Sequence, residues 1–368
     1  MSTIEFILDS FWNSQIWLPP NVTWKDLEPN DDIAYANYRH LILPLPMAFV
    51  MLMFRFTLER YLFAPLGVFL GIKTRKKRHL APNEALKKVA HVNRKLTHSE
   101  LVGLSKRLDL SERQVERLLR QQHAQYKPST LTKFCETSWR FLYYLSSFLF
   151  GVFCLWDKPW LWDINNCWTN YPHQSVPDDC WWYYMMSLTF YWALAASQFF
   201  DVQRKDFWPM FIHHITTICL LSFSWVCNMV RIGTLVLLIH DCADIFLEAA
   251  KMAKYAKYQK TCDGIFVIFA LLWIITRIGI YPFWILHNSL IGAPKLVEMF
   301  PAYYIFNSML LILLFLHVIW TCIILKLAYK FLFSGQCEGD LRSSSSEAEE
   351  DSANGLREES TYKSHNID

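Results

Sequence analysis

Long apolar runs alternate with short polar blocks along the chain. A bilayer core of about 30 Å is crossed by roughly 20 mostly apolar helical residues. The pattern predicts an all-α polytopic membrane protein with seven transmembrane helices, at Leu41–Leu62, Phe141–Trp156, Trp182–Phe200, Phe211–Val230, Gly233–Ala249, Ile265–Leu286 and Tyr303–Leu327. The first run, which could extend to Ile72, is interrupted by Arg55, Glu59 and Arg60. We expect the long Arg side chains to snorkel to the interface.

The composition supports a membrane protein. Apolar residues make up 53% of the chain and charged residues only 19%, below the roughly 25% that is usual for soluble domains. The 16 Trp, 17 Tyr and 27 Phe residues suit bilayer interfaces, where amphipathic rings settle. These values exclude a disordered chain, a collagen-like fibre and a small disulfide scaffold.

Basic residues predict the orientation, because Lys and Arg in short loops stay on the cytosolic side. They concentrate in the loops that follow the odd-numbered spans, at residues 73–78, 204–205, 251–260 and 326–330. The opposite loops carry single basic residues, Lys158, Arg231 and Lys295. We therefore expect a luminal N-terminus and a cytosolic C-terminus. The first residues lack the features of a secretory signal peptide, so span one is expected to be the signal anchor.

The predicted luminal side carries two candidate modification sites. Asn21-Val22-Thr23 is a glycosylation sequon without a central Pro, which predicts a glycan on Asn21. Cys167 and Cys180 share one luminal loop, where oxidising conditions permit a disulfide. Two free thiols are an equally good interpretation of this pair.

A basic soluble insert is expected over residues 73–128. Ser99–Leu108 reads as an amphipathic helix, and Ser111 is positioned to cap a second helix over 112–126. Residues 110–115 resemble the helix-turn-helix half of a homeodomain. Residues 84–127 hold ten Lys/Arg and five Asp/Glu, a net charge of +5. Gln121 stands where a homeodomain carries its adenine-reading Asn, which argues against DNA binding and favours a basic platform for anionic lipid or an acyl-CoA phosphate.

Residues 333–368 form an acidic, polar tail that cannot build a core. Ser344 and Ser346 each precede an acidic residue by three positions, the pattern of acidic-directed kinases. We expect a disordered cytosolic tail that is phosphorylated at these two serines.

Polar residues inside the apolar runs are the candidates for chemistry, since one Asp or Arg at a helix centre costs about 2.5–3.5 kcal/mol on insertion scales. His240, Asp244 and Glu248 form an i, i+4, i+8 stripe, with Asp241 beside it. His213 and His214 are adjacent in the preceding run. At 1.5 Å per residue, His213 lies roughly 8 Å and Asp244 roughly 9 Å from the cytosolic surface. Both groups are therefore expected to meet in one cavity.

A carboxylate that holds an imidazole fixes its tautomer and stabilises its charged form. Such an imidazole can act as a general base or as a nucleophile in acyl transfer. Two other interpretations remain. A membrane His can simply donate to a backbone carbonyl, as we expect for His317. His and Asp also bind metals, but a single adjacent His pair does not supply the spaced His boxes of a di-iron hydroxylase, so no metal is predicted.

The chain resembles ceramide synthases, whose catalytic part is the TLC membrane domain. The motifs that carry the resemblance are residues 201–207, His213-His214, 223–225, 231–235, 240–244 and 247–252, with 138–140, 157–160 and 171–172 upstream and 282–285 downstream. The resemblance covers about residues 131–332, and the homeobox-like insert ahead of it is typical of animal members. A motif of this length is highly specific.

The resemblance implies N-acylation of a sphingoid base by a fatty acyl-CoA, which gives dihydroceramide or ceramide in the endoplasmic reticulum. It implies catalytic roles for His213, His214, Asp241 and Asp244. Neighbouring polar groups are expected to bind substrate: His240, Glu248, Arg204 and Lys205. Spans two to seven would form a helical bundle or barrel around an acyl cavity, with no cofactor beyond the acyl-CoA co-substrate.

The expected organisation follows from these assignments. It comprises a luminal segment at 1–40, the first span at 41–72, the insert at 73–128, a catalytic TLC domain at 129–332 and the tail at 333–368. Membrane lipids and a homo- or heterodimer partner are further expected contacts.

The functional class that competes with an enzyme is a TLC-domain lipid sensor or chaperone without turnover. Loss of the His pair or of the Asp residues would mark that class, and neither is lost. A membrane-tethered transcriptional regulator is disfavoured by Gln121.

Overall fold

A computed structural model describes residues 5, 9–28, 33–73, 98–115, 128–202 and 204–334. Within these ranges the chain is helical and contains no strand. Several expectations lie outside the described residues. These concern residues 74–97 of the insert with the basic residues 74–78, residues 116–127 with Gln121, and the tail with Ser344 and Ser346.

Most of the described chain belongs to long apolar helices. They are α3 (Pro44–Leu58), which continues through η3 (Glu59–Phe63) into α4 (Ala64–Phe69); α8 (Thr130–Leu155); α10 (Asp178–Ser197); α11 (Phe207–Val226); α12 (Val230–Tyr255); α13 (Gln259–Trp273), which continues through η5 (Ile274–Leu286) and η6 (Asn288–Gly292) to α14 (Ala293–Leu296); and α15 (Pro301–Ser334). Proline begins both α3 and α15, where a missing N–H costs no helical hydrogen bond. Four of the seven predicted spans fall within continuous helical segments, namely Tyr38–Phe69, α12, α13 with η5, and α15. The spans Phe141–Trp156, Trp182–Phe200 and Phe211–Val230 end one to four residues beyond α8, α10 and α11.

Within the described part of the chain, five segments are long and apolar enough to cross a membrane: Tyr38–Phe69, Thr130–Leu155, Phe207–Val226, Gln259–Leu296 and Pro301–Phe333. The protein is thus a multi-pass membrane protein. Helices α10 and α12 have 20 and 26 residues, which is sufficient length, but their sequences are more polar. The prediction of seven spans is therefore confirmed for five segments by length and composition.

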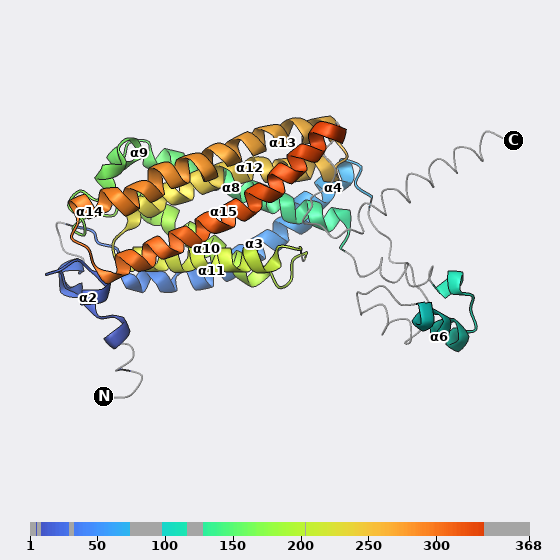
Figure 1. Cartoon of the computed structure of the whole chain (residues 1–368), viewed down its shortest axis with the longest axis horizontal. Coiled ribbons are helices and arrows are strands. Elements are labelled where there is room, and N and C mark those ends of the chain that lie inside the picture. Colours follow the sequence, from blue (N-terminus) through green and yellow to red (C-terminus); the bar gives the residue numbers. More distant parts are fainter. Residues whose placement is uncertain are drawn as a thin grey trace.

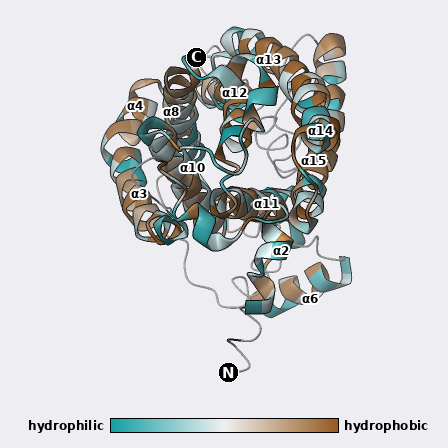
Figure 2. Cartoon of the chain, turned by 90° about the vertical axis from the view of Figure 1, so that its left-hand side faces the viewer, coloured by the Kyte–Doolittle hydropathy of each residue, from teal (hydrophilic) through white to brown (hydrophobic). Residues whose placement is uncertain are grey.

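Six of the long segments form a closed ring. Going round it, α8 packs on α12, α12 on α13 and η5, η5 on α15, α15 on α11, α11 on α10, and α10 on α8. Figure 2 looks along this bundle and shows the helices arranged around its centre. Helix α3 lies outside the ring against α10, and α4 lies against α8. The first helix is therefore an addition to a six-membered bundle.

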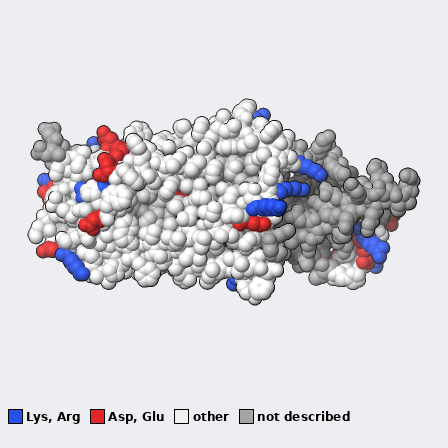
Figure 3. Space-filling model, turned by 90° about the horizontal axis from the view of Figure 1, so that it is seen from above, with Lys and Arg blue, Asp and Glu red and all other residues white. Residues whose placement is uncertain are grey.

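Charged side chains avoid the middle of the molecule. On the face drawn in Figure 3, Lys, Arg, Asp and Glu gather toward the two ends, and a broad uncharged belt separates them. The N-terminal segment, α9 (Pro159–Trp162) and α14 lie at one end, whereas α4 and the end of α15 lie at the other (Figure 1). This distribution suits a bundle that stands across a bilayer.

The N-terminal segment covers the first of these ends with aromatic side chains. Trp17, in α2 (Ser14–Trp17), is 2% exposed and packs on Phe223 with ring centroids 4.9 Å apart. Asn21, the predicted glycosylation site, is exposed at this end. Of the two interpretations of Cys167 and Cys180, the structure has the free thiols and not the disulfide. Both are buried, and their burial raises the pKa of the Cys167 thiol.

The described part of the insert matches the predicted helix and turn. Helix α6 (His98–Leu108) buries Leu104 against Val115 in a small separate core. The Ser111 backbone N–H donates to Gln114 Oε1 at 2.9 Å, and the Gln114 N–H returns a bond to Ser111 Oγ at 3.4 Å. This reciprocal pair caps the next helical turn, as expected for Ser111.

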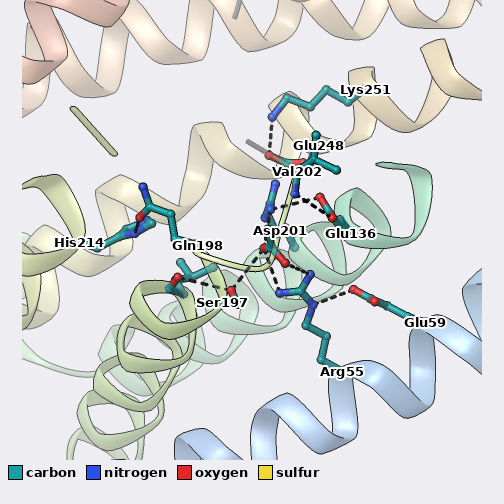
Figure 4. Close-up of polar contacts among 12 residues, drawn as sticks. Arg55, Glu59, Glu136, Ser197, Gln198, Asp201, Val202, His214, Glu248 and Lys251 are labelled. Atoms are coloured by element: carbon teal, nitrogen blue, oxygen red, sulfur yellow. Dashed lines mark hydrogen bonds and ion pairs between the residues drawn. The ribbon is translucent and has the colours of Figure 1, made fainter. Parts of the chain in front are cut away.

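The expectation that Arg55 snorkels to the interface is wrong. Its side chain is buried within the protein, and the residue is 2% exposed. It forms a bidentate ion pair with Asp201, at 2.6 and 3.1 Å, and bonds Glu59 Oε1 at 2.7 Å (Figure 4). A carboxylate from the loop between α10 and α11 provides a partner inside the bundle, which removes the need to reach water. By contrast, Arg60 is exposed.

Candidate functional site

Two cavities lie inside the bundle. The outer cavity, of about 230 Å³, opens among the ends of α8, α10, α11, α12, α13 and α15. Its charged lining residues are Arg140, Asp201, Arg204, Asp206, Asp244, Glu248, Lys251, Lys254 and Arg277. The inner cavity, of about 60 Å³, continues among α10, α11, α12 and α15. Among the described residues that line the inner cavity there is no Asp, Glu, Lys or Arg.

The two cavities share part of their walls. Tyr191, His213 and His240 line both of them, so these side chains mark the junction between the charged and the apolar space. His213 comes from α11 and His240 from α12, two helices that contribute residues to the walls of both cavities. The expectation that the His pair and the polar stripe of α12 share one cavity is thus met by the geometry, although the catalytic roles stay a prediction.

The two adjacent histidines have different surroundings. The His213 ring packs edge-on against Trp320, with centroids 5.4 Å apart, and its Nδ1 is buried without a hydrogen-bond partner among the described residues. His214 is buried, and its Nδ1 lies 2.9 Å from Oε1 of Gln198. A buried polar atom without a partner is costly, which makes His213 Nδ1 a candidate contact for a substrate.

The Gln198 amide determines the tautomer of His214. Its Nε2 donates to the carbonyl oxygen of Phe207 at 2.7 Å, and a carbonyl can only accept. Gln198 Oε1 is therefore the atom that faces His214, so Nδ1 of His214 must carry the proton. In the neutral ring, Nε2 of His214 is then an unprotonated base. Figure 4 shows Gln198 between His214 and the loop that follows α10.

The stripe on α12 points into the outer cavity, as its helical spacing predicts. His240, Asp244 and Glu248 all line this cavity. Asp241 lies off the stripe, outside the residues that line either cavity, and accepts a hydrogen bond from Ser147 of α8 at 2.6 Å. The two Asp residues that sequence reasoning grouped together thus have different partners.

Arg277 is the main partner of Asp244. It lies in η5, a wider helical stretch that contains Pro282, and it is 3% exposed. Its Nη2 bonds Asp244 Oδ2 at 3.0 Å and also donates to the carbonyl oxygen of His240. Its guanidinium carbon lies 5.0 Å from the centre of the Trp273 ring, in cation–π geometry. A buried positive charge therefore contacts the acidic stripe directly.

His317 does not donate to a backbone carbonyl as expected. It is fully buried on α15, with Nε2 placed 3.2 Å from His240 Nε2 and 3.4 Å from Arg277 Nη1. The Nδ1 atom of His240 lies 2.6 Å from the Val236 carbonyl oxygen, so that atom carries the proton. The polar network therefore joins three helical segments, α12, η5 and α15, where the sequence predicted only a bond to a backbone carbonyl.

The expected substrate-binding residues occupy different positions. Glu248 is 4% exposed, with Oε1 2.6 Å from Lys251 Nζ and Oε2 buried without a partner among the described residues. Arg204 lines the outer cavity, whereas Lys205 is exposed and is not among the lining residues. The cavity thus brings together Arg204, Glu248 and His240 but leaves Lys205 at the surface.

Within the described residues, no group of three or more His, Cys, Asp or Glu side chains is arranged to hold a metal ion.

The sequence analysis did not predict roles for Gln198, Arg277 and Ser147, or the pairing of Arg55. Arg277 did leave a signal, since it is a lone charge in an apolar run, whereas Arg55 is one of three charged residues in the first run. Gln198 left none, because an amide near a helix end is unremarkable.

A closed bundle with a His pair and an acidic stripe at the mouth of an apolar cavity defines a membrane protein that handles a lipid-like ligand at a polar centre. The chain matches the family model described as the TLC domain over residues 133–326. This match includes the His pair, the stripe of α12 and Arg277, whereas Arg55 lies outside it.

Curated relatives extend the similarity to most of the chain. Human "Ceramide synthase 5" is 44% identical over 344 residues, which cover 92% of this chain and 88% of the relative. Mouse "Ceramide synthase 3" is 42% identical over 335 residues, or 90% and 87% of the two chains. "Ceramide synthase hyl-1" of Caenorhabditis elegans is 34% identical over 350 residues, or 91% and 84%. The chain therefore belongs to the ceramide synthase family, and is a multi-pass membrane transferase of sphingolipid metabolism.

Proposed function

We propose that the protein transfers a fatty acyl group from acyl-CoA to the amine of a sphingoid base, giving dihydroceramide or ceramide. The single observation that carries this proposal is the junction of the two cavities at His213. A thioester bound there would place its CoA part in the charged outer cavity and its hydrocarbon tail in the apolar inner cavity. The membership of the ceramide synthase family supports the same reaction.

The reaction breaks the thioester C–S bond and forms an amide C–N bond. The amine loses a proton to a base, and the departing thiolate of CoA takes up a proton. In this proposal His213 receives either the acyl group or the amine proton, since its Nδ1 has no partner among the described residues. His214, whose Nε2 is left unprotonated by the bond from Nδ1 to Gln198, supports it as a second base.

The two carboxylates have separate roles in this proposal. Asp244 and Arg277 form an ion pair in the cavity wall, where preorganised charges stabilise the charge that develops during acyl transfer. Asp241, bonded to Ser147, ties α12 to α8 and so holds the stripe in place.

We propose seven spans, with α10 and α12 crossing the membrane inside the ring. The outer cavity faces the cytosol, where acyl-CoA is found, and the exposed Asn21 faces the lumen of the endoplasmic reticulum.

The test uses microsomes from cells that lack endogenous activity. Wild type, His213→Ala and the control His287→Ala are expressed, and sphinganine is supplied with a panel of acyl-CoAs. His287 is exposed and lines neither cavity. We expect product from the wild type and the control, and a fall of at least about 100-fold for His213→Ala, the low end of the effect of losing an acid–base group.

Each result decides one part of the proposal. Product from none of the three proteins, at equal membrane levels, would reject the synthase and favour a lipid sensor or chaperone. Equal product from all three proteins would support the proposed reaction but show that His213 has no role in catalysis. Incubation with radiolabelled acyl-CoA alone separates the two mechanisms, because a labelled protein requires an acyl intermediate, whereas an active enzyme without label reacts by direct attack.

A further inference from the structure

Arg55 connects the first helix to the loop between α10 and α11. It lies on α3, outside the TLC-domain match at 133–326, yet it is more deeply buried than most charged groups of the chain at 2% exposure. Its two Nη atoms bond the two oxygens of Asp201 at 3.1 and 2.6 Å. A bidentate guanidinium–carboxylate pair fixes both distance and orientation, which a single point charge does not.

Asp201 joins this pair to the ring. Arg140 of α8 donates to Asp201 Oδ2 at 3.1 Å, and Glu136 of the same helix accepts from the Val202 backbone N–H at 3.2 Å. Burial opposes ionisation of Asp201, but the guanidinium groups of Arg140 and Arg55 outweigh it and lower the pKa of that carboxyl. The loop is therefore held from two sides, by α3 and by α8, as Figure 4 shows.

The same loop begins at Gln198, the residue that bonds His214. Ser197, the last residue of α10, also bonds Asp201 Oδ2 at 3.3 Å, so the clamp reaches the residue next to Gln198. Because Gln198 bridges Phe207 of α11 and His214, a shift of the end of α10 would move the amide away from the imidazole. Apolar packing between α3 and α10 cannot fix this end to the same degree, since it has no directional bond.

We propose that Arg55 is a positioning residue of the acyl-transfer site: through Asp201 it holds the end of α10 so that Gln198 fixes the tautomer of His214. This inference rests on the proposed function. It assigns a role in catalysis to the helix that lies outside the TLC-domain match. It also explains why the apolar helix α3 contains Arg55, because an Arg inside the membrane is energetically costly unless it is paired.

Arg55→Met, Arg55→Lys and the control Arg60→Met test this role in the microsomal assay. Met is apolar and of similar length, and Asp201 keeps Arg140 as a partner in each variant. Arg60 is the exposed arginine of the same helical segment, with its guanidinium over Tyr61. We expect Arg55→Met to lower kcat by roughly 10- to 100-fold, the effect of a small misplacement of a catalytic group, with KM for both substrates unchanged. Arg55→Lys should recover part of kcat, and Arg60→Met should match the wild type.

A second pair of proteins separates positioning from general destabilisation. If Arg55 acts through Gln198, then adding Arg55→Met to the Gln198→Ala variant should not lower kcat any further. Full additivity of the two losses would overturn the proposal, as would wild-type kcat in Arg55→Met. Poor accumulation of both Arg55 variants in membranes, with normal accumulation of Arg60→Met, would make the role structural and also overturn it. An inactive wild type would reject the proposed function instead.

Discussion

The two cavities of this bundle differ in almost every property except their meeting point. Nine charged side chains stand among the apolar ones that line the outer cavity, whereas the described residues that line the inner cavity are apolar or uncharged polar. Some charges of the outer cavity are paired between segments, as in Arg277 with Asp244, and others along one helix, as in Lys251 with Glu248. The difference suggests that each cavity holds a different part of one amphiphilic ligand, because an apolar chain and a phosphate-bearing group need opposite surroundings.

The meeting point is where chemistry is expected. At His213 a reacting bond would have charged groups on one side and apolar packing on the other, which excludes water without removing the charges that act on the transition state. The comparison predicts that variants of the outer cavity change stability or substrate capture, whereas variants of the inner cavity change the selection of the acyl chain.

The largest effect is expected from Arg277→Met in the outer cavity. Met removes the buried guanidinium that pairs with the half-buried Asp244 carboxylate, and loss of one partner of a buried ion pair costs at most about 3–5 kcal/mol. Thermal unfolding of the detergent-solubilised protein, followed by size-exclusion chromatography, should show a clear loss of stability. The double variant Arg277→Met/Asp244→Asn should regain part of it, and Arg60→Met is the matched control. If Arg277→Met unfolds at the same temperature as the wild type, the ion pair contributes little to the stability of the protein.

An intermediate effect is expected from Gly233→Val in the inner cavity. A side chain at Gly233 would collide with the Tyr184 ring, which bonds Ser224 and lines the same cavity. The narrowed space should reduce use of the longest acyl-CoAs by about 10-fold or more relative to shorter ones, the scale of methylene discrimination in apolar pockets. Gly264→Val is the control, since nothing lies within 4 Å of a side chain added there. If activity falls equally for acyl-CoAs of all lengths, the wall of the inner cavity at Gly233 does not select the acyl chain.

The smallest effect is expected from Arg204→Gln at the rim of the outer cavity. Loss of one half-buried positive charge should raise KM for acyl-CoA by about threefold, since a single such interaction contributes up to about 1 kcal/mol. KM for sphinganine should stay unchanged, and the effect should shrink as salt is added. Lys205→Gln, a neighbouring exposed charge outside the cavity lining, is the control. An equal change in both KM values would show that the rim does not distinguish the CoA part.

The sequence predicted the features that depend on spacing along one helix. The apolar runs are confirmed as membrane-crossing segments in five cases, and the i, i+4, i+8 stripe does face a single cavity. The resemblance to ceramide synthases is confirmed by the TLC-domain match and by relatives that cover about nine-tenths of the chain. The catalytic roles of the His pair and the two Asp residues stay a prediction.

Errors arose where a partner comes from another part of the chain. Arg55 was expected at the interface, but Asp201, far away in the sequence, provides a partner inside the protein. His317 was expected to bond a backbone carbonyl, but η5 and α12 bring Arg277 and His240 to it. Asp241 and Asp244 look equivalent in sequence, yet their side chains leave α12 on different faces and contact α8 and η5.

The sequence by itself thus determined the membrane class, the family and the set of polar residues that share one helix face. These follow from composition and from the fixed geometry of the α-helix, which are local properties. Only the tertiary structure decided that His213 lies at the junction of two cavities, that Gln198 fixes the tautomer of His214 and that the first helix reaches this site through Arg55 and Asp201. The physical reason is that hydrogen bonds and ion pairs are short and directional, so their partners depend on how the helices pack.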